Sequence, residues 1–327
     1  MTHPVDPAVE KAHRDVVRLF RAATADELAA VCRAARDRLA ALPALDPDDP
    51  STWTSYELIT ADVRSLIGFL GEAGVPNSEP ERFRSLVIRV LRYLYAADRA
   101  ESGVLLAELV RNDWEPAIGE SHVHTLAAAA RLAACLHAHG DSEQARPVFE
   151  RILLLRSRTH GDDHPETLLA ACNLGACLNR LQDFRAAFQL NTGIVRRCER
   201  RLGRDDRTTI LAAGNLAGSL FGLGQLEMAL TLYRDVHRRH SRVTGENSLA
   251  ALDAQASIAI TLHKLGDYET ARTVNAGLVP RFERVAGKDY SGTENARARL
   301  EMNLRALGRD EEADDVHGGM PRFGSPP

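Results

Sequence analysis

The feature that most constrains the fold is a repeat with a fixed period of 42 residues. Glycines recur at this spacing without insertion or deletion, at Gly119, Gly161, Gly203, Gly245 and Gly287. Two further columns keep the same register: Leu136, Leu178, Leu220, Leu262 and Leu304, and Ala145, Ala187, Ala229, Ala271 and Ala313. A fixed period of this size predicts an array in which each supersecondary unit stacks on the next.

Residues 161–202 show the content of one unit. Gly161 is expected to end the preceding helix in the left-handed conformation. Asp163 is expected to cap the next helix, with Glu166 completing a capping box. A turn at 181–183 then separates the two helices of the unit. Because no segment alternates apolar and polar residues as a strand would, the sequence predicts an all-α fold.

The period also sets the expected domain organisation. Residues 1–76 lie outside the clear repeat and read as an N-terminal region of three helices. We expect six repeat units, the outer two degenerate, at 77–118, 119–160, 161–202, 203–244, 245–286 and 287–317. The Gly- and Pro-rich residues 318–327 are expected to form a disordered tail.

Composition and absent motifs exclude several classes of protein. A net charge of −4 over 327 residues disfavours nucleic-acid binding. No apolar run approaches the ~18 residues of a membrane span, and no signal peptide is evident, so we expect a cytoplasmic protein. The five cysteines form no CxxC pair, which favours free buried thiols. The predominance of Arg over Lys and the high Ala content are typical of a GC-rich bacterial genome.

Catalytic and metal-binding signatures are also missing. The chain has no phosphate-binding P-loop, no GxSxG and no HExxH. A nucleophile at Cys172, paired in space with a histidine, is a weaker alternative. The run Asp162-Asp163-His164 resembles a metal motif but is better explained as a helix entry. We therefore predict a protein that is not an enzyme and has no metal or cofactor.

The unit sequence resembles a known family. The pattern N-L-G-x-x-L from Asn173 to Leu178, followed by a turn and the alanine at Ala187, resembles the tetratricopeptide repeat. The 42-residue length and the G-x-D-H-P-x-T entry from Gly161 to Thr167 are similar to the kinesin-light-chain subtype. This resemblance implies a right-handed superhelical solenoid of helix-turn-helix repeats. It further implies a concave groove, lined by the first helix of each unit, in which asparagines bind an extended peptide.

Two sets of residues are candidates for this groove. A polar column recurs inside apolar helices, and such residues must satisfy hydrogen bonds or face the groove: Arg89, Arg131, Asn173, Asn215, Ser257 and Arg299. Further side chains are expected near the same face: Arg92, His137, Asn179, Arg180, Phe221, His263, Lys264 and Arg305. The alternative is that the asparagines bridge neighbouring repeats and serve only the fold.

The Arg-rich character of this face suggests its partner. Arg pairs bidentately with carboxylates, so we hypothesise an acidic or C-terminal-carboxylate peptide. Arginines that merely solvate a helical surface are the alternative. The favoured function is a scaffold or adaptor that binds a peptide or protein, with neither nucleic acid nor membrane as partner. A regulatory sensor that moves the array against the N-terminal helices, an accessory factor in an enzyme pathway and a homo-oligomer are the remaining alternatives.

Overall fold

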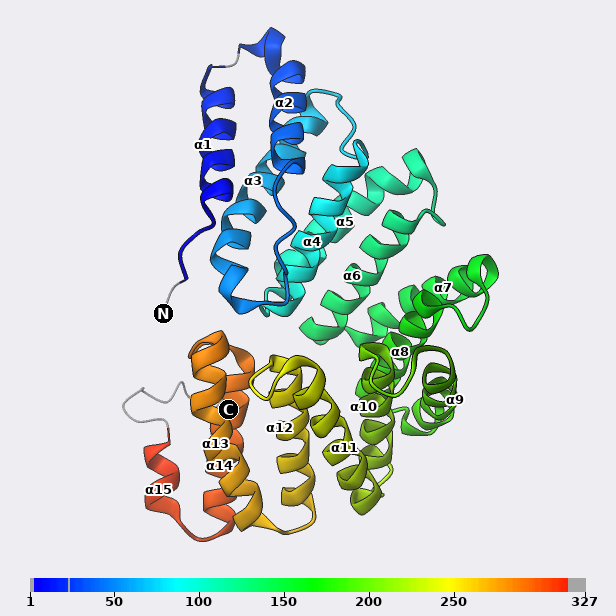
Figure 1. Cartoon of the computed structure of the whole chain (residues 1–327), viewed down its shortest axis with the longest axis vertical. Coiled ribbons are helices and arrows are strands. Elements are labelled where there is room, and N and C mark those ends of the chain that lie inside the picture. Colours follow the sequence, from blue (N-terminus) through cyan, green and yellow to red (C-terminus); the bar gives the residue numbers. More distant parts are fainter. Residues whose placement is uncertain (1–2, 23, 317–327) are drawn as a thin grey trace, which may run out of the picture. The chain divides into compact units, whose positions relative to one another are not determined.

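The computed structural model describes residues 3–22 and 24–316, and over these residues every regular element is a helix (Figure 1). The helices are α1 (Pro7–Ala22), α2 (Leu28–Ala40), α3 (Trp53–Glu72), α4 (Glu81–Ala96), α5 (Ala100–Ile118), α6 (Val123–His139), α7 (Ser142–His160), α8 (Pro165–Arg180), α9 (Phe184–Leu202), α10 (Arg207–Gly222), α11 (Leu226–Thr244), α12 (Leu249–Lys264), α13 (Tyr268–Ala286), α14 (Ser291–Ala306) and α15 (Asp310–Asp315). Two short 3₁₀ helices, η1 (Ala25–Glu27) and η2 (Pro50–Thr52), precede α2 and α3. The predicted all-α fold is confirmed, whereas the tail predicted at 318–327 lies outside the described residues.

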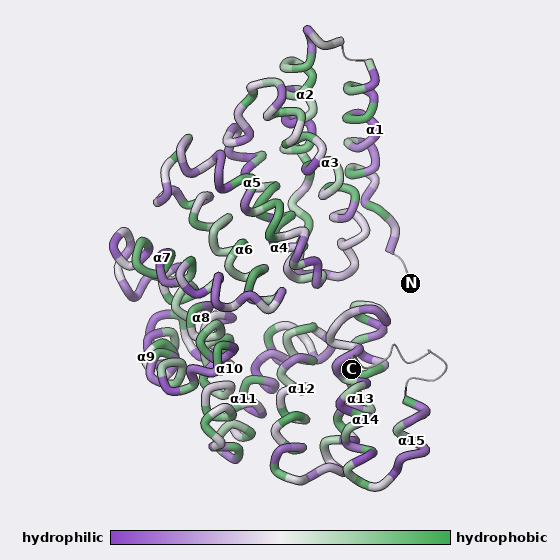
Figure 2. Tube along the Cα trace, turned by 180° about the vertical axis from the view of Figure 1, so that it is seen from behind, coloured by the Kyte–Doolittle hydropathy of each residue, from purple (hydrophilic) through white to green (hydrophobic). Residues whose placement is uncertain are grey.

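The chain forms two compact units, which we call the N-terminal unit (Met1–Asp162) and the C-terminal unit (Asp163–Pro327). The first contains α1 to α7 and the second α8 to α15. Within each unit, helices that follow one another along the chain pack against one another. Hydrophobic and hydrophilic residues alternate around the helices rather than forming separate segments (Figure 2). This pattern is expected for amphipathic helices that bury one side and expose the other.

Each 42-residue segment from residue 77 onward holds one pair of helices, beginning with α4 and α5. The alanine column explains how closely the pairs pack, because Ala145, Ala187, Ala229, Ala271 and Ala313 are all fully buried. At the same position of the first segment stands Gly103, where an added Cβ would lie 2.5 Å from the Cys135 Sγ. A small residue is therefore required wherever the second helix crosses its neighbour.

The turn between the two helices of a pair requires a positive φ. Gly140, Gly224, Gly266 and Gly308 supply it at φ values of 71° to 105°. Gln182 (φ 60°) and Asp98 (φ 61°) take the same conformation at equivalent positions, although a side chain disfavours it. The backbone therefore keeps the period even where the glycine is missing.

Two details of the predicted helix entry are wrong. Gly161 has a positive φ of 82°, but its ψ of 162° is extended rather than left-handed helical. The cap of α8 is His164, whose ring nitrogen accepts from the Glu166 N–H, and not Asp163. The Asp163 carboxylate instead accepts from Arg197 Nε at 2.7 Å, because a guanidinium is a stronger partner than a backbone amide. The interpretation of Asp162-Asp163-His164 as a helix entry nevertheless holds.

The N-terminal helices pack on the first repeat pair within their unit. Tyr56 of α3 stacks on Tyr93 of α4 with ring centroids 5.2 Å apart, and Trp53 approaches the same ring edge-on at 6.3 Å. Phe83 of α4 and Trp114 of α5 are fully buried in the same unit. In the C-terminal unit, Leu252, Leu278, Phe282, Ala256 and Ala296 join α12, α13 and α14 in one cluster. Among the described residues, no helix is both long enough and apolar enough to cross a bilayer.

Candidate functional site

The first helix of every pair carries a stripe of exposed or half-buried side chains. We call this stripe the first-helix face; it belongs to α4 and α6 in the N-terminal unit and to α8, α10, α12 and α14 in the C-terminal unit. On α12 it consists of Asp253, Ser257, Ile260 and Lys264, all exposed or half-buried, while Ala254 beside them is buried. This spacing of four, three and four residues places the side chains along one stripe of the helix. All the predicted groove residues lie on these six helices.

In the N-terminal unit, the central residue of this face is Arg131 of α6. Its side chain is half-buried, and it forms no hydrogen bond or ion pair with any described residue. Burial lowers the pKa of its guanidinium and the nearby Arg92 lowers it further, while Tyr95, Cys135 and Asp48 act in the opposite direction. An arginine stays charged under such conditions. Arg131 therefore presents a desolvated positive charge without a bonded counter-ion.

Two further arginines of α4 lie nearby but are already engaged by the N-terminal helical region. Arg92 donates from Nε to the Asp48 Oδ1 at 2.9 Å, and its second nitrogen also pairs with that carboxylate, which raises the pKa of Arg92. Arg89 interacts with the hydroxyl of Tyr56, and its own Nε is buried without a partner. The fourth predicted residue of this unit, His137, contacts Ser142 Oγ at 2.9 Å.

Asp48 belongs to a loop of residues 43–49, which we call the acidic loop. Its backbone is held by α3: the Tyr56 hydroxyl donates to the Leu45 carbonyl at 2.8 Å, and Trp53 Nε1 donates to the Pro47 carbonyl at 3.1 Å. The sequence marks this stretch as a helix breaker, and nothing in its local pattern indicates that Asp48 meets Arg92. Asp48 is thus a residue of the face that the sequence prediction missed.

In the C-terminal unit, two of the three predicted asparagines, Asn179 and Asn215, take part in a hydrogen-bond network between repeats. Asn215 Nδ2 donates to the Cys172 carbonyl at 2.7 Å, and Asn179 Nδ2 donates to the Asn215 carbonyl at 2.8 Å. The buried Ser219 donates to Asn179 Oδ1 at 2.8 Å and accepts from the fully buried Asn191 at 3.0 Å. Asn179 and Asn215 therefore bridge neighbouring helices, as the structural alternative predicted.

The later helices of this unit carry a pair of opposite charges. Asp253 of α12 is exposed, and Arg299 of α14 is half-buried. They interact electrostatically, yet neither forms an ion pair or a side-chain hydrogen bond with a described residue. Burial raises the pKa of Asp253 to about 6 despite the opposing effect of Arg299. Asp253 was also missed, because its column holds leucines at Leu169 and Leu211 and shows no polar pattern.

The remaining predicted residues divide into bonded and free side chains. His263 bonds to Asn303 Oδ1 at 2.6 Å, Arg305 pairs with Glu301 and Asp314, and Ser257 donates to the Asp253 carbonyl of its own helix. Arg180 and Lys264 are exposed, Asn173 and Phe221 are half-buried, and none of these four has a hydrogen bond or ion pair with a described residue.

Neither a cysteine nucleophile nor a metal site is supported by the described residues. All five cysteines are free and buried. The hydrogen bond that the Cys172 thiol donates to Cys198 and burial both raise the pKa of Cys172, so this thiol is not activated as a nucleophile. In the described part of the chain, no three His, Cys, Asp or Glu side chains are grouped as a metal site would require.

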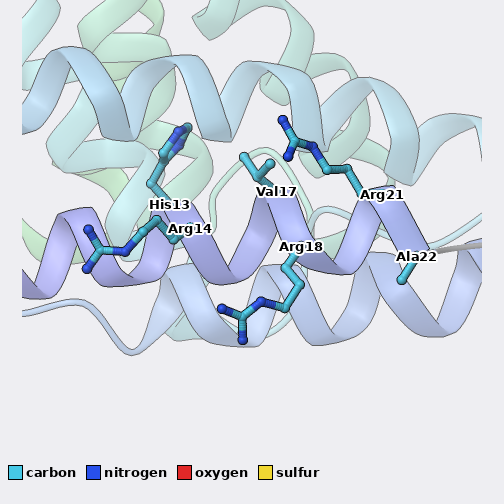
Figure 3. Close-up of a pocket in the computed structure, with 6 residues that line it drawn as sticks. All are labelled: His13, Arg14, Val17, Arg18, Arg21 and Ala22. Atoms are coloured by element: carbon cyan, nitrogen blue, oxygen red, sulfur yellow. The ribbon is translucent and has the colours of Figure 1, made fainter.

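An open hollow of about 430 Å³ lies along α1. It is lined by side chains of this helix alone, and in Figure 3 Arg14, Arg18 and Arg21 point in different directions. The neighbouring His13 is engaged by Asp62 at 2.9 Å. These side chains do not converge on one point, so the hollow is an exposed helix surface rather than a built site.

Comparison with known proteins agrees with the repeat architecture. Residues 112–192 and 208–276 match the family model described as tetratricopeptide repeat. Among curated proteins, none matches the chain. Many solved structures are similar to it, and three of them illustrate the likeness. NprR in complex with its cognate peptide NprX is 11% identical, with 98% of this chain and 91% of that chain covered and a TM-score of 0.58.

The second, BtubC (BKLC) from P. vanneervenii, is 15% identical over 72% of this chain and 96% of its own, with a TM-score of 0.51. The third consists of the repeats of a Podosopora anserina putative kinesin light chain. It is 19% identical, with 62% of this chain and 95% of that chain covered and a TM-score of 0.47. At these identities the first two likenesses speak for the fold alone. The repeat columns, the helix pairs that carry them and the family match together show that the chain contains tetratricopeptide repeats over residues 112–192 and 208–276.

Proposed function

We propose that this chain is a non-catalytic binding module that holds a peptide or protein segment on its first-helix face, with carboxylates of that segment on the arginines of the N-terminal unit. The observation that carries the proposal is Arg131, a half-buried guanidinium without a bonded counter-ion. Leaving a desolvated charge uncompensated is costly, and a ligand carboxylate would relieve that cost through two charge-assisted hydrogen bonds.

A similar fold is known to accept a peptide. NprR, whose solved structure covers 98% of this chain, is seen there with its cognate peptide NprX. The likeness supports a peptide as the class of ligand for this chain. The acidic character of the ligand rests on Arg131 and Arg92 instead, since nothing in that comparison bears on charge.

The test is a charge reversal with a matched control. Labelled peptides that differ only in their number of carboxylates are titrated against the protein and against Arg131→Glu, and bound fractions are measured by fluorescence anisotropy. We expect Arg131→Glu to weaken binding of the acidic peptides by roughly 100-fold, equivalent to losing a buried charge pair. Circular dichroism should show the same helicity for Arg131→Glu as for the unchanged protein.

The control is Arg158→Glu on α7, which makes the same charge change on an exposed side chain of a second helix. Equal losses for Arg131→Glu and Arg158→Glu would mean that net charge, and not the first-helix face, governs binding. Unchanged affinity in both variants would refute the proposal.

A second candidate function is a sensor, and one contact favours it. The acidic loop, which belongs to the N-terminal helical region, holds Arg92 of the same face through Asp48. A ligand that recruits Arg92 would therefore compete with a contact between that region and the first repeat. A sensor needs two states with different ligand affinity. Small-angle scattering curves that are identical with and without a bound peptide would argue against this function.

A further inference from the structure

A second cavity lies in the N-terminal unit, away from the first-helix face. It measures about 220 Å³ and is enclosed by the end of α5, the start of α6 and the middle of α7. None of the predicted groove residues lines it. Its interior is formed by aliphatic side chains, among them Leu126, Ile152 and Leu155, which are all buried.

A departure from the repeat pattern accounts for the cavity. At the position of Leu155, the three following units carry Arg197, Arg239 and Arg281. Each arginine reaches from its second helix to the entry loop of its own unit: Arg197 to Asp163 at 2.7 Å, Arg239 to the Arg204 carbonyl at 3.2 Å and Arg281 to Asn247 at 2.9 Å. Leu155 is too short to do this. The space that a guanidinium spans in the other units is left lined by apolar atoms.

The rim of the cavity contains one unused donor. Arg151 and Glu120 form a bidentate pair at 2.7 and 2.6 Å, so their charges compensate each other. Arg111 Nε, in contrast, is buried without a hydrogen-bond partner among the described residues; Arg111 forms only a long i,i+4 ion pair with Glu115, at 3.9 Å. Thr125 also has an unpaired buried hydroxyl, but Thr167 and Thr209 share this at equivalent positions, so it is not specific to the cavity.

We propose that this cavity is a second binding site, which takes an apolar group of about the size of a benzene ring attached to a carboxylate. The apolar group would lie against Leu126, Ile152 and Leu155, and the carboxylate would accept from Arg111. An apolar cavity of about 150 Å³ is known to bind benzene, so about 220 Å³ leaves room for a slightly larger group. Buried polar atoms that lack partners favour a ligand that supplies them.

Phenylacetate is a suitable probe, with neutral phenylacetamide as its counterpart. Binding is measured on the full chain by methyl NMR, because Leu126, Val148, Ile152 and Leu155 carry reporter methyl groups in the lining. We expect phenylacetate to shift these methyl signals with a dissociation constant on the order of 1 mM. Phenylacetamide should bind about 10-fold more weakly, since it lacks the charge-assisted bond.

Two variants test the two halves of the site. Leu155→Arg restores the residue of the other units and fills the cavity, so binding should be lost while the helices stay folded. Arg111→Gln keeps the cavity and removes the charge, so it should weaken phenylacetate about 10-fold and leave phenylacetamide unchanged. Arg131→Glu serves as control: it alters the first-helix face and should not affect phenylacetate at all.

Three outcomes would overturn the proposal. They are no methyl shift up to about 10 mM probe, undiminished binding to a folded Leu155→Arg, and equal binding of the acid and the amide to the unchanged protein. Should Leu155→Arg fail to fold, Arg111→Gln with the acid–amide pair still decides the question. Since the site is separate from the first-helix face, its failure leaves the proposed peptide binding untouched.

Discussion

Asn215 of the C-terminal unit and Arg131 of the N-terminal unit occupy the same column of the repeat but differ in their contacts. Asn215 forms hydrogen bonds between helices, in a network that also contains Asn179 and Ser219. In the N-terminal unit the same column carries Arg131, which bonds to no described residue, and Arg89, whose Nε is unpaired. One repeat position can therefore stabilise the array or remain available to a ligand.

The largest expected effect on stability comes from exchanging the residue types of Asn215 and Arg131. Asn215→Arg removes the donor to the Cys172 carbonyl and should lower the free energy of unfolding of this region by about 2 kcal/mol. Arg131→Asn removes an unpaired half-buried charge and should leave the stability unchanged or raised. Hydrogen exchange of α10 and α6 is the appropriate measurement, because repeat arrays open locally rather than all at once. Equal losses of exchange protection in α10 and α6 would contradict the different roles of Asn215 and Arg131.

A smaller effect is expected from Asp48→Asn, which frees Arg92 from the acidic loop. The Asp48–Arg92 pair is about two-fifths exposed on both sides, so it is worth at most about 1 kcal/mol. The variant should therefore bind an acidic peptide roughly 5-fold more tightly.

The matched control is Glu120→Gln, which breaks the similarly exposed bidentate pair with Arg151 away from the first-helix face. It should leave the affinity as it was. If both variants tighten binding alike, overall charge and not Arg92 is responsible.

The smallest expected effect is a pH dependence of the stability of the C-terminal unit that arises from Asp253. Although the Asp253 side chain is exposed, desolvation by the surrounding protein raises its pKa to about 6, so the folded state prefers the protonated carboxyl. Its contribution to stability is complete below about pH 4 and is lost as the pH rises through about 6. Asp253→Asn should therefore match the original protein at pH 4 and exceed it at pH 7. The gain should stay below about 1 kcal/mol, because solvent screens the exposed side chain.

Thermal unfolding at both pH values measures this difference. Asp48→Asn, which removes an acidic side chain from the other unit, is the comparison variant. A stability gain for Asp253→Asn that is as large at pH 4 as at pH 7 would show that the carboxyl does not titrate in this window.

The periodic part of the fold could be predicted because it is local. The alanine column and the positive-φ turns recur at one spacing, and each depends on the packing of a helix against its immediate neighbour. The helix entry was predicted less well: His164 and not Asp163 caps α8, because Asp163 is drawn to Arg197 from the second helix. A capping pattern cannot reveal such a competitor 34 residues further along the chain.

The choice of which polar residues remain available depends on tertiary contacts. The sequence shows that Arg131 and Asn215 share a column. It does not show that Asn215 donates to the Cys172 carbonyl, or that Arg131 bonds to no described residue. The pairing of Asp48 with Arg92 joins residues 44 positions apart and has no periodic signal. Leu155 likewise stands where the three following units have an arginine. That this difference leaves a cavity becomes clear only from the structure, in which those arginines bond to the entry loops of their units. The periodic sequence determines the helical scaffold, because every stacked pair of helices makes the same contacts. Which exposed side chains remain available to a ligand is decided by the tertiary structure, because it depends on contacts with residues distant in the sequence.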